Sequence, residues 1–409
     1  MKIKQLNSAS IQNRPTAKAI FLIGFAQILV WGGSFFVLSV LARPIMDETG
    51  WARQWVYGGL SLGIFISGVL LPSVGKCIKR YGGREILAWS GAVAALGLII
   101  IAITHTLPWF IFSWVILGIA MAMGLYDALG NSYGRGAKTA ITTVTLISGF
   151  CTTLVWPLLA YGVTHVGWRE TCLIWAAVLI VTVWPIYRIA LPVTLPSPTV
   201  HENRLTNKVT VTVDKKVYQL MSVIFMLAAI IMTVISVQLI DILQDSGFTQ
   251  AVAVGVTALI GPSQVAARVM DIVIKFKHPV LSLLVSVVLV LAGLMLIVIF
   301  PLHAVFAVIV YGCGNGLRSI VRGTLPLAIL KADEFAVVMG RIFRPSLIAQ
   351  GATPIISALI FEHFGTEALM LTLVAIAAVS VVLSLFLHKR IKQLAAEKSL
   401  SPPEALNIC

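Results

Sequence analysis

The chain has 409 residues, of which 58% are hydrophobic and 11% are charged, whereas soluble globular proteins carry about 25% charged residues. This composition excludes a water-soluble globule, so the useful structural unit is the membrane-spanning helix of ~20 apolar residues. The net charge of +14 would suggest a nucleic-acid partner in a soluble protein. In a membrane protein the distribution of charge among the loops matters more than its sum.

Twelve apolar segments follow a polar N-terminal stretch, and the first is too long for a signal peptide and lacks a small-residue cleavage site. The predicted spans are 19–42, 54–74, 85–104, 108–130, 139–163, 171–191, 218–240, 250–272, 279–300, 303–321, 345–361 and 367–388. The longest polar interruption, 192–216, divides them six and six. We therefore expect an N-terminal tail (1–18), a six-helix bundle (19–191), a linker (192–216), a second six-helix bundle (217–388) and a C-terminal tail (389–409).

The two sets of six spans resemble each other. His165-Val-Gly167 follows the fifth span and His363-Phe-Gly365 follows the eleventh, each with a glutamate within three residues. Small residues recur at helix-packing spacing in both sets, namely Gly59, Gly63 and Ser67 in span two and Gly312 and Gly316 in span ten. The predicted fold is an all-α polytopic membrane protein built of two pseudo-symmetric six-helix bundles, which is a transporter architecture.

Positive charge is distributed very unevenly between the two sides of the predicted bundle. The side that holds both termini and the linker collects 25 Lys and Arg residues, and the opposite side has three, Arg43, Arg53 and Arg169. Because cytoplasmic loops carry the excess of positive charge, the termini and the linker are predicted to be cytoplasmic, in a bacterial inner membrane. The net positive charge therefore indicates how the chain is oriented in the membrane, and no nucleic-acid partner is expected.

Ionisable side chains within spans are the first candidates for function, because each costs ~2.5–3.5 kcal/mol at the bilayer centre. Arg268 in span eight and Arg318 in span ten are candidates for binding an anionic substrate, since a guanidinium holds a carboxylate through two parallel hydrogen bonds. The alternative is a structural role, in which each pairs with a neighbouring acid or carbonyl or extends to the cytoplasmic edge. Asp271, three residues after Arg268, is such a neighbour.

Asp127 in span four is the candidate proton site, because burial raises the pKa of a carboxylate and protonation removes its charge. A salt bridge to Arg135 or Lys138 is the structural alternative. Asp241 and Asp245 form a DxxxD pattern that we interpret as a solvated helix end rather than a diphosphate site.

Aromatic residues and prolines within spans offer weaker signals. Trp31, Phe35, Phe36 and Trp156 could line a cavity or serve in packing. Pro262, Pro326 and Pro345 interrupt apolar stretches, where they mark either broken helices or tolerated kinks.

The sequence offers little for enzymatic or metal chemistry. No histidine begins an HxxxxD pattern, and there is no HExxH or GxxxxGK[ST]. The pattern GxSxG occurs twice, at Gly59-Leu-Ser-Leu-Gly63 and Gly130-Asn-Ser-Tyr-Gly134, but within or next to predicted spans rather than at a strand-to-helix turn. The five cysteines (Cys77, Cys151, Cys172, Cys313 and Cys409) lack ligand spacing, and those beside apolar stretches fit as small apolar fillers. We expect no enzyme, no cofactor and no metal site, and nothing in the sequence requires an oligomer, so we expect a monomer.

The loop after span two carries a recognisable motif. Gly75-Lys-Cys-Ile-Lys79-Arg80-Tyr-Gly82-Gly-Arg84 resembles the cytoplasmic motif GxxxDRxGRR of the major facilitator superfamily, with Lys79 in place of its acid. The resemblance implies a secondary transporter whose gating motif comprises Gly75, Lys79, Arg80, Gly82 and Arg84. In the family the acid belongs to a charge network between the halves, so that network must be altered here.

Within that superfamily the chain is similar to bacterial relatives of monocarboxylate transporters and oxalate:formate exchangers, over about residues 20 to 388. The similar segments are Trp31-Gly32-Gly33, Gly50-Trp51-Ala-Arg53, Tyr133-Gly-Arg135, Gly167-Trp168-Arg169 and Ala267-Arg268. This resemblance implies that Arg268 binds the substrate carboxylate.

Three positions depart from the pattern of those relatives. Gln264 stands where an aspartate is expected, span one has no lysine, and Arg341 and Arg344 only precede span eleven. The predicted substrate is a small organic anion, with proton coupling left open, and the substrate-binding candidates are Arg268, Arg318, Trp31 and Gln264. The alternative is a carrier of a drug, siderophore or vitamin, in which the arginines are structural.

Overall fold

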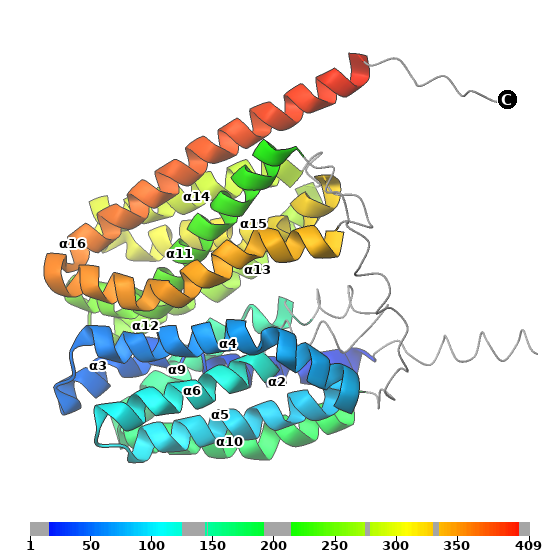
Figure 1. Cartoon of the computed structure of the whole chain (residues 1–409). Helices are drawn as coiled ribbons and strands as arrows, with labels where there is room; N and C mark the ends of the chain where they lie inside the picture. Colours follow the sequence, from blue (N-terminus) through cyan, green and yellow to red (C-terminus); the bar gives the residue numbers. More distant parts are fainter. Residues whose placement is uncertain are drawn as a thin grey trace, which may run out of the picture.

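The structure, a computed structural model, describes residues 16–124, 144, 146–191, 214–274, 279–329 and 335–400. Every regular element in these ranges is a helix. Figure 1 shows the helices in two layers, with α2 to α10 in the lower layer, hereafter the N half, and α11 to α16 in the upper layer, the C half. Asp127, Arg135, Lys138 and Tyr133 lie outside the described residues.

The helices of each half follow the predicted spans in chain order. Those of the N half are α2 (Ala17–Gly32), α3 (Leu38–Thr49), α4 (Arg53–Tyr81), α5 (Gly83–Ile103), α6 (Leu107–Gly124), α9 (Cys151–Val166) and α10 (Trp168–Ala190). Those of the C half are α11 (Lys215–Asp245), α12 (Gln250–Ala258), α13 (Ile260–Ile274), α14 (Pro279–Ile299), the 3-10 helix η2 (Pro301–His303), α15 (Ala304–Ile329) and α16 (Phe335–Leu400).

Ten helical segments of the described chain are long and apolar enough to cross a membrane. The last of them, 342–394, covers two spans, because α16 has a non-helical residue at Gly365. Helices α2 and α3 together cover the first predicted span, which is not among these ten segments. The twelve predicted spans are therefore confirmed, and the chain is a multi-pass membrane protein.

The predicted internal repeat is visible in the backbone of the turns. Gly167 (φ 90°) and Gly365 (φ 81°) take the same left-handed region after the fifth and eleventh spans. Gly50 (φ 68°) and Gly247 (φ 94°) do so after the first and seventh. Residues with a Cβ atom rarely adopt this left-handed conformation, so glycine is favoured at these turns. We call the end of the bundle with these four turns the turn end, and the opposite end, where α10 stops and α11 begins, the linker end.

The predicted small-residue contacts are also confirmed. A Cβ added at Gly59 would lie 2.3 Å from the Trp114 side chain, and one added at Gly316 would lie 2.4 Å from the Gln264 carbonyl oxygen. A Cβ added at Gly118 would lie 2.6 Å from the Gly63 carbonyl oxygen. These glycines let α4 approach α6, and α15 approach α13, at backbone distance.

Two spans are broken rather than continuous. Residues 33–37 separate α2 from α3, and Leu259 separates α12 from α13. Pro262 lies in the first turn of α13, where a missing backbone N–H costs no helical hydrogen bond. Pro326 and Pro345 lie inside α15 and α16, which continue through them, so these two prolines are tolerated within their helices.

Candidate functional site at the seam between the halves

A buried ion pair joins the two halves at the turn end. Arg53, the first residue of α4, donates from Nη1 to Asp241 Oδ2 of α11 at 2.6 Å. The Tyr57 hydroxyl donates to the same oxygen at 2.7 Å. The Arg53 guanidinium also lies 3.9 Å from the ring centre of Phe361 on α16. Arg53, Tyr57, Asp241 and Phe361 form what we call the turn-end cluster.

Backbone contacts next to the turn-end cluster complete the closure of this end. Ser39 Oγ donates to the Ser236 carbonyl at 2.7 Å, which joins α3 to α11. The Ile355 N–H donates to Ser61 Oγ at 3.0 Å, which joins α16 to α4. The contact surface between the halves, hereafter the seam, is therefore closed at the turn end.

The interpretation of Asp241 as a solvated helix end is wrong. Its side chain is 3% exposed and bound across the seam. Asp245 is exposed and accepts a hydrogen bond from Thr366 instead. The two carboxylates of the DxxxD pattern thus have separate partners. One signal in the sequence does indicate a partner for Asp241, namely the isolated Arg53 on a side with few other cations.

Farther from the turn end, α9 packs tightly against the broken eighth span. Thr153 Oγ1 donates to the carbonyl of Ala258 at 2.9 Å, next to the break at Leu259. A Cβ added at Gly261 would lie 2.5 Å from Thr153 Oγ1 and 2.8 Å from the Gly149 carbonyl oxygen. Facing glycines therefore bring the two backbones together across the seam.

Arg268 reaches this part of the seam. Its Nη1 atom lies 3.4 Å from the position of a Cβ added at Gly149, so its guanidinium extends from α13 to the N half. Its side chain is half-buried. Asp271, the alternative partner considered from the sequence, accepts a hydrogen bond from Ser282 at 3.0 Å. Gln264, one turn before Arg268, has its backbone against Gly316.

Arg318 lies in a different place, inside the C half. Its Nε donates to Asn315 Oδ1 at 2.9 Å. The guanidinium lines a small cavity among α11, α14, α15 and α16, together with Tyr311 and Ser286. The two predicted substrate-binding arginines therefore do not share one surface.

Trp31 belongs to an aromatic group at the break in the first span. Its ring centre lies 5.6 Å from that of Phe35 and 5.7 Å from that of Phe36. Phe36 in turn lies 5.7 Å from Trp156 of α9. Phe35, Phe36 and Trp156 are buried, whereas Trp31 is half-buried. Most of this group serves in packing, and Trp31 is its accessible member.

The motif between spans two and three forms a helix end and a turn. Gly82 has a φ of 88°, which requires glycine, and it separates α4 from α5. Gly75 lies within α4, and Lys79 lies in its last turn. Arg80 lies 5.2 Å from the ring centre of Tyr81, and Arg84 follows Gly83 at the start of α5. Only one glycine of the motif makes the turn.

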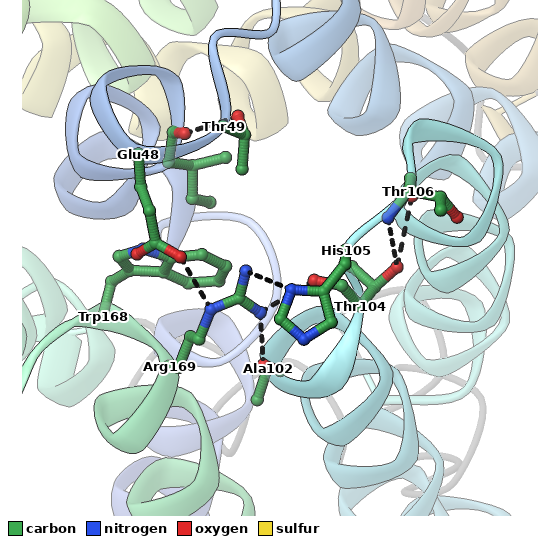
Figure 2. Close-up of polar contacts among 9 residues, drawn as sticks. Glu48, Thr49, Ala102, Thr104, His105, Thr106, Trp168 and Arg169 are labelled. Atoms are coloured by element: carbon green, nitrogen blue, oxygen red, sulfur yellow. Dashed lines mark hydrogen bonds and ion pairs between the residues drawn. The ribbon is translucent and has the colours of Figure 1, made fainter.

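Arg169 of the Gly167-Trp168-Arg169 segment braces the turn end of the N half, as Figure 2 shows. Its Nε donates to Glu48 at 2.9 Å, and its Nη1 donates to the carbonyls of Ala102 and Thr104, both at 2.7 Å. Trp168 Nε1 donates to the other Glu48 oxygen at 2.5 Å. Partial burial raises the pKa of Glu48, but these hydrogen bonds outweigh it and leave that pKa below its usual value.

Three solved structures are similar to this chain in fold. A peptide transporter, POT, in complex with sulfate has a TM-score of 0.72 and 13% identity, covering 95% of this chain and 98% of its own. The nucleoside transporter NupG has a TM-score of 0.66 and 14% identity, covering 91% and 98%. A bacterial homologue of the human lysosomal transporter Spinster, inward-facing and occupied, has a TM-score of 0.64 and 14% identity, covering 92% and 97%.

No curated protein sequence matches the chain. The sequence pattern of the Major Facilitator Superfamily, however, matches residues 20–343, which is most of its length. Because this family consists of carriers of small solutes, the match makes the chain a transporter of a small solute rather than an enzyme. Two six-helix halves, a seam closed at one end and this sequence match together establish that the chain belongs to the major facilitator superfamily.

Proposed function

We propose that this transporter moves a small organic anion across the bacterial inner membrane by alternating access. The observation that carries the proposal is Arg268, which extends from the C half to Gly149 of the N half. A solute that passes between the halves must pass the seam. A guanidinium there offers a fixed charge and two parallel donors, which match a carboxylate.

The turn-end cluster supports the alternating part of the proposal. The Arg53–Asp241 pair and its neighbours close one end of the seam. A carrier that opens to either side must break such contacts when it opens that end. The distribution of Lys and Arg supports an orientation in which the turn end faces away from the cytoplasm.

Proton coupling at Asp127 remains a hypothesis from the sequence, because that residue lies outside the described ranges. A carrier of a drug, siderophore or vitamin is the second candidate. It is favoured by Arg318, which is held by Asn315 inside the C half, away from the seam. On that alternative Arg268 would be structural as well.

Uptake into proteoliposomes distinguishes the two candidates. The probes are radiolabelled mono- and dicarboxylates, with nucleosides and dipeptides as the comparison set, with and without an imposed pH gradient. For a transported carboxylate, Arg268→Ala should raise KM by about tenfold or more, because charge-assisted hydrogen bonds contribute about 1.5–3 kcal/mol. Arg268→Lys should recover part of the loss, because it keeps the charge without the planar pair of donors.

Arg43→Gln is the matched control, since it removes an exposed cation of α3. It should leave KM unchanged. If the alanine variant at position 268 takes up the carboxylate with the KM of the unmodified protein, the anion proposal is wrong. Saturable uptake restricted to the comparison set would favour the second candidate.

A further inference from the structure

Three side chains on one face of α15 surround the small cavity inside the C half. Tyr311, Asn315 and Arg318 are spaced by four and three residues, so they lie one above another on the helix. Helical side chains lean toward the N-terminus, which brings Arg318 back over Asn315. The 2.9 Å hydrogen bond from Arg318 Nε to Asn315 Oδ1 shows this contact directly.

The cavity is small and presents mainly hydrogen-bond donors. Its volume is about 20 Å³, room for about one water-sized particle. Asn315 uses its oxygen toward Arg318, which leaves its amide nitrogen as a donor. Tyr311 is 1% exposed, and its hydroxyl makes no hydrogen bond within the described part of the chain.

The remaining polar side chains of the cavity do not change this character. The hydroxyls of Ser286 and Ser380 also line it, but they donate to the carbonyls of Gly314 and Ile376. The residues that line the cavity include no carboxylate. The hydrogen-bond donors available to a particle in the cavity are therefore those of Arg318, Tyr311 and Asn315.

The charge of Arg318 is not balanced by a protein group in the part of the chain that the structure describes. None of the ion pairs among these residues includes it. Two further cations, Arg322 and Arg268, act on it and repel it. A cation within a span is costly unless an anion accompanies it. The site therefore has an excess of positive charge and space for one small particle.

We propose that Arg318, Tyr311 and Asn315 bind a small inorganic anion of halide size inside the C half, apart from the seam. A halide is close to water in size, so it fits the cavity, whereas an organic carboxylate with its carbon skeleton is too large for it. The guanidinium supplies the charge, and the phenol and amide supply further donors. The bound anion compensates Arg318 and holds α15 against α11, α14 and α16.

Thermal unfolding of the purified full-length protein tests this proposal. Sodium bromide or chloride replaces sodium gluconate at constant ionic strength, and intrinsic tryptophan fluorescence reports Tm. A ligand that binds only the folded state raises Tm in a saturable way. We expect bromide and chloride to raise Tm by a few degrees, on the order of 2–4 °C, relative to gluconate.

Substitutions then locate the site. Arg318→Gln should abolish the halide-dependent rise, and Tyr311→Phe should raise the half-maximal halide concentration by about tenfold because it removes one donor to an anion. Arg43→Gln is the control, because it removes an exposed cation of α3 in the other half. The control should keep the rise. If Arg318→Gln is too unstable to purify, Tyr311→Phe alone decides.

Three results would overturn the proposal. Equal Tm values in halide and gluconate would mean that the cavity holds only an ordered water. A halide response that survives unchanged in both cavity variants would place the anion elsewhere. Competition between bromide and a transported carboxylate, or an equal effect of acetate, would make this cavity part of the solute path. The Arg268 experiment is independent of all three outcomes, because it measures KM at the seam.

Discussion

The absence of a side chain at Gly316 sets how closely α15 approaches α13. A Cβ there would lie 2.4 Å from the Gln264 carbonyl oxygen, which belongs to backbone and cannot rotate away. Gly316→Ala should therefore destabilise the protein by about 1–3 kcal/mol, the usual cost of overpacking. The loss should appear as a lower Tm of the purified protein.

Gly68 of α4 provides the matched control for that substitution. A Cβ added there has no atom within 4 Å. Gly68→Ala should be neutral or stabilising by about 0.5–1 kcal/mol, because alanine loses less backbone entropy in a helix. Equal Tm values for the two variants would contradict the packing argument.

Arginines within spans could be found from the sequence, but their directions could not. A charge in an apolar run is visible at once, which identified Arg268 and Arg318. Whether each faces the seam or the interior of one half depends on the rotation of α13 and α15, and neighbouring helices set that rotation. Glu48 was missed because its partner Arg169 is 121 residues away.

The start of α11 depends on one carboxylate with two tasks. Asp214 Oδ1 accepts from the N–H groups of Lys216 and Val217 at 2.9 and 3.0 Å, and Oδ2 accepts from Arg390 of α16 at 2.7 Å. The hydrogen bond from Arg390, followed by that from the Val217 N–H, lowers the pKa of Asp214 below its usual value. This residue caps α11 and anchors the extension of α16 beyond the last span.

Two substitutions separate the tasks of Asp214. Asp214→Asn can keep the cap and loses the charge, whereas Asp214→Ala loses both and should cost about 0.5–2 kcal/mol for the cap alone. Because the folded pKa is lowered, the charge stabilises the protein above the unfolded value of 3.8 and this contribution disappears as pH falls below it. The Tm difference between the unmodified protein and Asp214→Asn should shrink on acidification; a constant difference would contradict the assignment.

At the level of whole helices, hydropathy predicted the spans but not their breaks. Long apolar runs suffice to locate spanning helices, since lipid requires every backbone polar group to be satisfied internally. The break at residues 33–37 has no proline, and a side chain satisfies a carbonyl that it frees, since Ser34 Oγ donates to the Val30 carbonyl at 2.6 Å. The break in the eighth span comes three residues before Pro262, because proline fits within a first helical turn.

The molecule as a whole is closed at the turn end, and Asp241 there accepts the ion pair that crosses the seam from Arg53. Asp241→Asn leaves Arg53, 19% exposed, without its counter-charge. Loss of one partner of a buried ion pair costs about 3–5 kcal/mol. This cost is most of the ~5.5 kcal/mol that converts a 99:1 ratio of closed to open conformations into 1:99. The variant should populate a conformation open at the turn end.

Distances between spin labels measure this opening. The labels are placed at Arg43 of α3 and Ser246 after α11, both exposed, in a background without the native cysteines. Asp241→Asn should add a population at longer distance. Glu85→Gln, which breaks the Arg188–Glu85 pair inside the N half, should not. Identical distance distributions for Asp241→Asn and the unmodified protein would exclude this role for the turn-end cluster.

The fold of the whole chain followed from few rules, namely apolar length, charge asymmetry and a weak repeat. The match of the Gly167 and Gly365 backbones shows why the repeat could be recognised, since a left-handed turn retains its glycine while the helices diverge. The boundaries of the tails and the linker stay predictions. The pairing of Arg53 with Asp241 spans 188 residues, and no local pattern encodes it.

The hydrogen bond from Thr153 to the Ala258 carbonyl has a consequence for how the carrier moves. The acceptor belongs to the broken eighth span and the donor belongs to the other half. When α9 and α12 part, that oxygen is left without its hydroxyl, and in a dry environment an orphaned carbonyl is unfavourable. Under the alternating access proposed above, hydration must therefore accompany separation at this point, so opening the seam is a wetting transition as well as a rotation of the two halves.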